Sequence, residues 1–257
     1  GEGPRPPERA PRLWDGGRPG QARAFSCAPG APAEPARGES ALVGGGGIYS
    51  GRADSRGRTL LVAQSGREYV GEPTGSPDGT RLYVSRSNLG DVAAFDLTSA
   101  AHPMLWRHDV SGYKADHATL SPDGKRLVVS ATAVDKAEVL DAATGALVGS
   151  FGTGHYPHQN DYSANGQHIY NGSIGDISLP YGLDFLKGFR TLTVVDATTL
   201  ANVRTYWFTE GIRPAVITAD EKTMYAELSY LNGLIRYDLV SGNITANQLT
   251  TVRPDML

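Results

Sequence analysis

The sequence predicts an all-β fold, a β-propeller built of four-stranded antiparallel blades. Three observations lead to this prediction: a turn motif recurs, two apolar strand-like segments follow each turn, and an aspartate closes the second segment at a nearly constant distance. The turns are Ser76–Gly79, Ser121–Gly124, Ser163–Gly166 and Thr218–Glu221. They begin 45, 42 and 55 residues apart, a period within the range of propeller blades.

The distance from each turn to its closing aspartate distinguishes true repeats from chance resemblance, which would not keep its register across two strands. This distance is 17 residues in three copies: Gly79 to Asp96, Gly124 to Asp141 and Glu221 to Asp238. In the remaining copy it is 30 residues, from Gly166 to Asp196, so that copy holds 13 extra residues.

The turn motif has a physical explanation. Proline presets φ to about −65°, aspartate accepts a hydrogen bond from the backbone beyond it, and glycine adopts a positive φ. Glu221 stands where the other copies have glycine, so we expect that position to tolerate substitution better. The closing aspartates precede turns rich in Thr, Ser and Gly, whose amides they can bind, and we assign them structural roles.

These turns and strand pairs resemble the YVTN-type β-propeller repeat family, bacterial and archaeal relatives of the WD-repeat blade. The resemblance covers roughly Gly66 to the C-terminus. It implies a ring of blades around a channel, usually about seven, often in exported or cell-surface proteins. Ile48–Ala63 is interpreted as the remains of an earlier copy and Thr250–Pro254 as the start of another. We therefore expect about four to five blades and an incomplete ring.

Composition divides the chain into a head, residues 1–47, and the propeller repeats, residues 48–257. The head holds 8 of the 16 prolines and 11 of the 32 glycines, and we expect it to be disordered because it can bury little apolar surface. It has no apolar segment typical of a signal peptide, and we expect no membrane span. The compartment stays open.

Charge and cysteine content exclude several classes of function. The net charge is −3, from 24 basic and 27 acidic residues, with no basic stripe, so we expect no nucleic-acid partner. The single cysteine, Cys27, can form no intrachain disulfide. The motifs of serine hydrolases, zinc proteases and dinucleotide-binding folds do not occur, and we expect no cofactor.

The 13 extra residues of the third copy fall between its second and third strands, within Ile174–Gly188. In a propeller this connection lies on the entrance face, opposite the Ser-Pro-Asp-Gly turns. Loops that break a repeat's length are disproportionately functional. This connection is also apolar, which favours a functional surface. The alternative interpretation is that it packs as a short helix over its own blade. Its apolar residues are Leu179, Tyr181, Leu183, Phe185 and Leu186.

A polar cluster is predicted on the same face, near the channel mouth. His158 and Asn160 alternate along an inner strand, so they should point together into the channel. His117 and Arg213 occupy the corresponding segments of the neighbouring copies. The candidate residues for binding a ligand or partner are His117, His155, His158, Asn160, Arg213, Tyr181 and Phe185.

Four interpretations of this cluster stay open. His155 and His158, three apart on an extended chain, face opposite sides, which argues against a metal centre, and we predict none. General acid–base catalysis would need a histidine held by a carboxylate, for which Asp116 and Asp161 lie nearby in sequence. The third interpretation is that the cluster recognises a ligand or partner. The fourth is that these are channel residues whose polar groups are satisfied by water and backbone.

We favour a non-enzymatic binding module that presents its entrance face to a protein partner or a small ligand. No catalytic residue is predicted under this hypothesis. The alternative is a propeller enzyme of lactonase, hydrolase or quinoprotein type that uses the histidines at the channel mouth. Fold alone does not decide between them.

Overall fold

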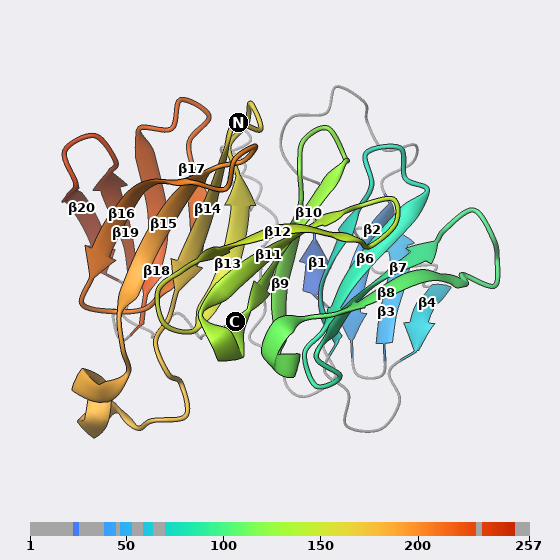
Figure 1. The fold of residues 1–257 in the computed structure, drawn as a ribbon, viewed down its shortest axis with the longest axis horizontal. Helices are drawn as coiled ribbons and strands as arrows, with labels where there is room; N and C mark the ends of the chain where they lie inside the picture. The colour runs from blue at the N-terminus through green and yellow to red at the C-terminus, as the bar shows by residue number, and fades with distance from the viewer. Residues whose placement is uncertain are drawn as a thin grey trace, which may run out of the picture.

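The computed structural model describes residues 23–25, 39–44, 47–52, 59–63, 70–229 and 233–249. Within them the chain forms five four-stranded antiparallel sheets (Figure 1). The first sheet comprises β1 (Arg23–Phe25), β2 (Glu39–Gly44), β3 (Gly47–Arg52) and β4 (Thr59–Ala63). The second comprises β5 (Val70–Gly75), β6 (Arg81–Arg86), β7 (Asp91–Asp96) and β8 (Met104–Asp109).

The remaining three sheets follow the same order. They comprise β9 (Ala115–Leu120), β10 (Arg126–Ala131), β11 (Lys136–Asp141) and β12 (Leu147–Gly152); β13 (Pro157–Tyr162), β14 (His168–Ser173), β15 (Arg190–Asp196) and β16 (Asn202–Phe208); and β17 (Ile212–Ile217), β18 (Thr223–Leu228), β19 (Gly233–Asp238) and β20 (Asn243–Leu249). Three short 3-10 helices connect strands in the described part of the chain: η1 (Ser111–Tyr113), η2 (Thr132–Val134) and η3 (Tyr181–Leu186).

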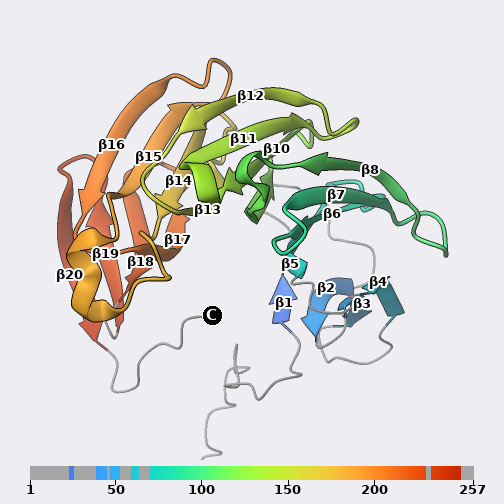
Figure 2. The same cartoon turned by 60° about the horizontal axis from the view of Figure 1, so that its bottom comes forward.

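The sheets are propeller blades set side by side in an open arc (Figure 2). Strands consecutive in sequence pair within each sheet. The first strands of neighbouring blades, from β5 through β9 and β13 to β17, lie against one another. The predicted all-β fold of four-stranded blades in an incomplete ring is therefore confirmed.

The turns between first and second strands have the predicted chemistry. Gly79, Gly124 and Gly166 have φ of 70°, 72° and 72°. In one turn the Asp123 carboxylate accepts hydrogen bonds from Ser121 Oγ at 2.7 Å and Lys125 N at 3.1 Å, and the hydroxyl contact is the main cause that lowers the pKa of Asp123. Asp123 thus stabilises its turn as an ionised group.

The core lies between blades, in layers. Leu127 and Val129 of β10 pack toward the preceding blade, where they meet Tyr83. Val128, between them in sequence, packs toward the following blade and meets Ile169. Alternate residues of a strand face opposite sides, so the second strand of an internal blade is apolar on both faces.

The last blade differs, because only one of its faces is covered. Met224 and Ala226 of β18 are buried against the preceding blade, whereas Tyr225 between them is exposed. Leu234 of β19 is exposed as well. Within the described residues, this sheet presents an uncovered flank, as an incomplete ring requires.

The first sheet extends into the segment expected to be disordered. β1 and β2 both lie within residues 1–47, and Gly44 at the end of β2 pairs with Gly47 at the start of β3. For these two strands the structure differs from the expectation of disorder. The rest of residues 1–47 lies outside the described residues, and the proposed boundary at residue 47 stays a prediction.

None of the helices in the described part of the chain has the length and apolar character needed to cross a membrane. The expected start of a further copy at Thr250–Pro254 lies outside the described residues.

Candidate functional site

The four inner strands from β5 to β17 each carry a β-bulge at an equivalent position. In each of them the pairing register with the second strand of the blade shifts by one residue. The extra residue falls at positions 71–72, 116–117, 158 and 213–214. A bulge interrupts the alternation of side chains and re-aims them. Three candidate residues, His117, His158 and Arg213, occupy these bulges.

The structure brings His117 and His158 together across the boundary between two blades. Their ring centroids are 4.1 Å apart and the ring planes are tilted by 40°. Asp116 Oδ1 lies 3.6 Å from His117 Nε2. Burial, reinforced by the nearby charges of His117 and Arg213, lowers the pKa of His158 well below its ordinary value. His158 is therefore a neutral imidazole at neutral pH.

Asn160 serves as a link between blades. Only 2% of it is exposed, and its Nδ2 donates to His117 O and Ser130 Oγ, both at 2.9 Å. Its Oδ1 accepts a hydrogen bond from Asn171 Nδ2 at 2.8 Å. The sequence expectation that Asn160 would point into the channel beside His158 assumed a regular strand, which the bulge at His158 interrupts.

Gln159 forms the matching link on the other side of β13. Its Nε2 donates to Ala215 O and its Oε1 accepts from Ala215 N, both at 2.7 Å. Its primary amide thus pairs with the backbone of β17 as another strand would. The two consecutive amide side chains therefore hold β13 to both neighbouring blades.

Asp161 is the one carboxyl group of β13, and its pKa is strongly perturbed. It lines a small cavity between β13 and β17 together with Tyr170 and Ile212. Burial raises its pKa to about 6, partly offset by a backbone hydrogen bond at Tyr162. The cost of ionising Asp161 in the folded state therefore comes mainly from desolvation.

His155 belongs to a different part of the entrance face from His117 and His158. Its Nδ1 is 2.7 Å from Asp135 Oδ2, and Tyr156 N donates to Asp135 Oδ1 at 3.1 Å. Lys114 Nζ lies 4.4 Å from the centroid of the Tyr156 ring. These contacts join the start of β13 to the connection after η2 in the preceding blade.

The insertion of the third copy is anchored by polar contacts at its base. Arg190 donates to Asp184 Oδ1 at 2.8 Å, to Asp184 O at 2.9 Å, and to Thr209 O. Lys187 is buried, and its Nζ lies 3.8 Å from Asp184 Oδ1. A short helix, the alternative interpretation of this insertion, is present as η3, and Asp184 within it ties the insertion to the blade.

The tip of the insertion exposes large apolar side chains. Phe185 is 80% exposed and Phe189 is 71% exposed. Phe189 contacts Trp207 of β16 edge-on, with ring centroids 5.2 Å apart. We call this set the insertion surface; it comprises Ile177, Leu183, Phe185, Leu186, Phe189 and Trp207, all exposed. The side chain of Tyr181, a candidate from the sequence, lies outside the described residues.

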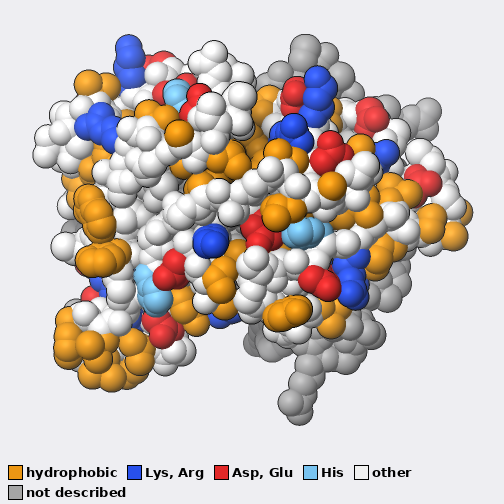
Figure 3. Space-filling model, in the orientation of Figure 1, with side chains coloured by type: hydrophobic (Ala, Val, Ile, Leu, Met, Phe, Trp, Pro, Cys, Tyr) orange, Lys and Arg blue, Asp and Glu red, His pale blue; other side chains and the backbone are white. Residues whose placement is uncertain are grey.

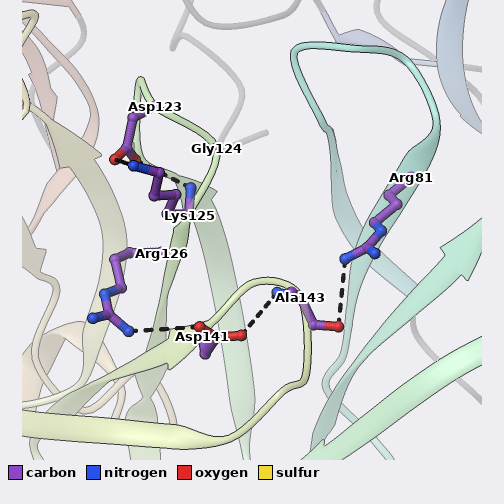
Figure 4. A pocket seen from close by; sticks show the side chains of 7 residues that line it. All are labelled: Arg81, Asp123, Gly124, Lys125, Arg126, Asp141 and Ala143. Carbon is purple, nitrogen blue, oxygen red and sulfur yellow. Dashed lines mark hydrogen bonds and ion pairs between the residues drawn. The ribbon is translucent and has the colours of Figure 1, made fainter.

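A pocket of about 360 Å³ lies on the opposite face, at the turns of two blades (Figure 4). Arg81 of one blade reaches the next blade and donates to Ala142 O and Ala143 O, both at 3.4 Å. Arg126 lies 3.8 Å from Asp141, which also accepts hydrogen bonds within its own turn. The polar groups of this pocket thus hold blades and turns together.

Several residues of the entrance face were missed by sequence reasoning. Gln159 and Ser130 act across blade boundaries, and no local pattern signals such contacts. Phe189 could have been found, because it is a large aromatic residue beside the irregular connection. Asp135 precedes a strand as an ordinary turn residue, and its partner His155 lies 20 residues away.

Comparison with known proteins supports the fold without identifying a family. No protein-family model matches the sequence, and no curated protein sequence matches it. Among solved structures, the chain is similar to hydrazine synthase of Kuenenia stuttgartiensis, a β-propeller-containing protein, with a TM-score of 0.57 and 22% identity. The match covers 69% of this chain and 48% of the other. The likeness shows the fold, and the class of protein is a β-propeller.

Proposed function

We propose that this chain is a non-enzymatic propeller module that binds a protein partner through its entrance face, with the insertion surface at the centre of the contact. The observation that carries the proposal is the exposure of Phe185 and Phe189 on an anchored, irregular segment. Grouped apolar side chains in water are unfavourable and mark interaction sites.

The shape of the insertion favours a protein partner over a small ligand. η3 projects from the end of its blade (Figure 1), and hydrophobic side chains gather at the same place in the space-filling view (Figure 3). Small molecules bind in concave sites, where most of their surface is enclosed. A projecting apolar group with aromatic side chains instead resembles the anchors of protein interfaces.

The repeats also support a finer assignment, to the YVTN-type propellers. Its basis is the recurring turn motif and the 17-residue spacing of three copies. We include in the proposed interface the sequence candidates on this face, Tyr181 and His155, with His117, His158 and Arg213 toward the channel.

The enzymatic alternative has less support. His155 is held by Asp135 at 2.7 Å, as a general base would be. However, His108 lies 3.0 Å from Glu138 and His168 lies 2.6 Å from Glu221. Since histidine–carboxylate contacts recur at several blade boundaries, the His155 pair is explained as one more structural contact.

Site-specific cross-linking tests the proposed interface. A photoreactive phenylalanine analogue is placed at position 185 of the full chain, and at position 147 as a control, because Leu147 is 54% exposed on the outer strand of another blade. We expect one protein from cells that produce the chain to cross-link at position 185 and not at 147. Equal labelling at both positions, or none at 185, would contradict the proposal.

A further inference from the structure

We propose that Asp116, His117 and His158 form a binding site for a divalent transition-metal ion of the zinc class. Each of the three side chains offers a ligand atom, and these atoms all lie within 4.8 Å of one another. The ligand atoms on one zinc ion are at most about 4 Å apart. Side-chain rotations that bring the ligand atoms closer by about 1 Å would therefore complete the site.

Two bulges create this arrangement. Asp116 and His117 are consecutive, and on a regular strand their side chains would face opposite sides. Between Ala115 and Ala118, however, two residues of β9 pair against the single residue Ser130 of β10. His158 is the extra residue of β13. The inner strands therefore direct side chains from two blades toward one position.

The backbone that carries these side chains is fixed from both sides. Asn160 Nδ2 donates to His117 O, and Thr119 Oγ1 donates to Asn160 O, both at 2.9 Å. These contacts hold β9 and β13 in one register close to the candidate ligands. A metal site needs such support, because ligands must be preorganised to within a fraction of an ångström.

A second observation also points to a ligand. His158 Nδ1 is buried and has no hydrogen-bond partner in the described part of the chain. Buried polar atoms are almost always satisfied, so each exception requires an explanation. A bound ligand would explain the exception at His158, because the imidazole would then have a partner that the polypeptide does not supply.

The donor set selects the class of metal. Two imidazoles and one carboxylate suit zinc and its neighbours in the transition series, whereas Mg²⁺ and Ca²⁺ prefer sites made of oxygen ligands. Three protein ligands leave a coordination position open. Arg213 acts electrostatically on His158, so its charge weakens cation binding while favouring an anionic ligand at the open position.

The sequence argument against a metal centre considered His155 with His158. The structure gives His155 a different partner, Asp135, and brings His117 to His158 from the preceding blade. Ligands from separate blades are invisible to an argument based on spacing within one strand. The inference stands independently of the proposed protein partner.

Metal titration of the full chain tests the site. The purified chain is treated with a chelator, dialysed, and titrated with Co²⁺ followed by visible absorption, then with Zn²⁺ in competition. We expect one equivalent to bind with the absorption of a tetrahedral or five-coordinate Co²⁺ site, and Zn²⁺ to displace it. Asp116→Asn and His158→Ala should each weaken Co²⁺ binding by about tenfold or more.

His108→Ala is the matched control, because His108 also lies against a carboxylate, Glu138, at 3.0 Å and belongs to neither proposed site. It should bind Co²⁺ as the unchanged chain does. Asp116→Asn is nearly isosteric, so it keeps the test valid if His158→Ala fails to fold. Absence of stoichiometric binding in the unchanged chain would overturn the proposal. Binding that survives Asp116→Asn, or that depends equally on His108, would also overturn it.

Discussion

Two neighbouring blades, β9–β12 and β13–β16, follow the same repeat and differ mainly in one connection. Both have a bulged inner strand, a tight turn with glycine at positive φ and a closing aspartate. Between second and third strands, however, the first blade has the short η2, and the second has the insertion that contains η3. The repeat thus builds the scaffold, and departures from it distinguish one blade chemically from the next.

The two connections also differ in what they contact. The short one ends at Asp135, which holds His155 and Tyr156 of the next blade. Its apolar residue Val134 is 38% exposed, whereas Phe185 at the tip of the insertion is 80% exposed. The connection of regular length therefore stabilises the contact between blades, while the long one exposes apolar surface that this contact does not require.

The claim that contacts between blades stabilise the scaffold is tested most strongly at Asn160. Asn160→Leu should lower the free energy of unfolding by about 2–4 kcal/mol, because it removes the Asn160 donor to His117 O and the Asn160 acceptor for Asn171 Nδ2 from a buried site. Asn202→Leu, on an exposed outer strand, should change it by less than about 0.5 kcal/mol. Urea denaturation measures both. Similar losses would show that the blades do not depend on this link.

The turns test whether the copies are equivalent. Gly124→Val should cost about 1–3 kcal/mol, since valine is strained at a φ of 72°. The sequence suggested that the Glu221 position is more tolerant, but Glu221 has a φ of 57° and its carboxylate contacts His168 and Tyr170, both at 2.6 Å. We therefore expect Glu221→Val to cost at least as much in thermal or urea unfolding. A clearly smaller loss there would restore the interpretation from sequence.

The pH dependence of stability provides a smaller effect. The pKa of Asp161 is raised from 3.8 to about 6, so the folded state binds more protons than the unfolded state between these values. Its contribution to stability therefore falls as the pH rises through this window. Asp161→Asn should raise the free energy of unfolding at pH 7 by up to about 3 kcal/mol, with the gain vanishing near pH 4.

Asp123→Asn is the control of opposite sign. Hydrogen bonds from Ser121 and Lys125 lower the pKa of Asp123, so its stabilisation is present at neutral pH and is lost as the pH falls below 3.8. Asp123→Asn should therefore destabilise the chain at pH 7 and lose this effect in acid. If both variants shifted stability in the same direction at pH 7, the assigned environment of Asp161 would be wrong.

The sequence predicted what local signals encode. The turns, the closing aspartates and the place of the insertion all follow from short motifs and their spacing, as at Ser121–Gly124 and Ile174–Gly188. The strand Glu39–Gly44 was missed because the proline and glycine content around it outweighed a short run of strand-forming residues.

The arrangement of the candidate site could not be predicted in the same way. The alternation rule failed at His158 because a bulge is set by pairing with another strand. The side chains of Asn160 and Gln159 act on backbone groups of neighbouring blades, which lie 43 and 56 residues away in sequence. Sequence reasoning therefore identified polar residues of the inner strands, but it could not identify their partners.

The central claim, that the insertion surface binds a protein partner, is tested most directly by affinity. The partner recovered by cross-linking at position 185 is titrated with the unchanged chain, with Phe185→Ser and with the control Leu147→Ser, after unfolding curves confirm that both variants are folded. We predict binding about thirtyfold weaker for Phe185→Ser, which corresponds to about 2 kcal/mol, and unchanged binding for Leu147→Ser. Equal affinities for all three chains would contradict the claim.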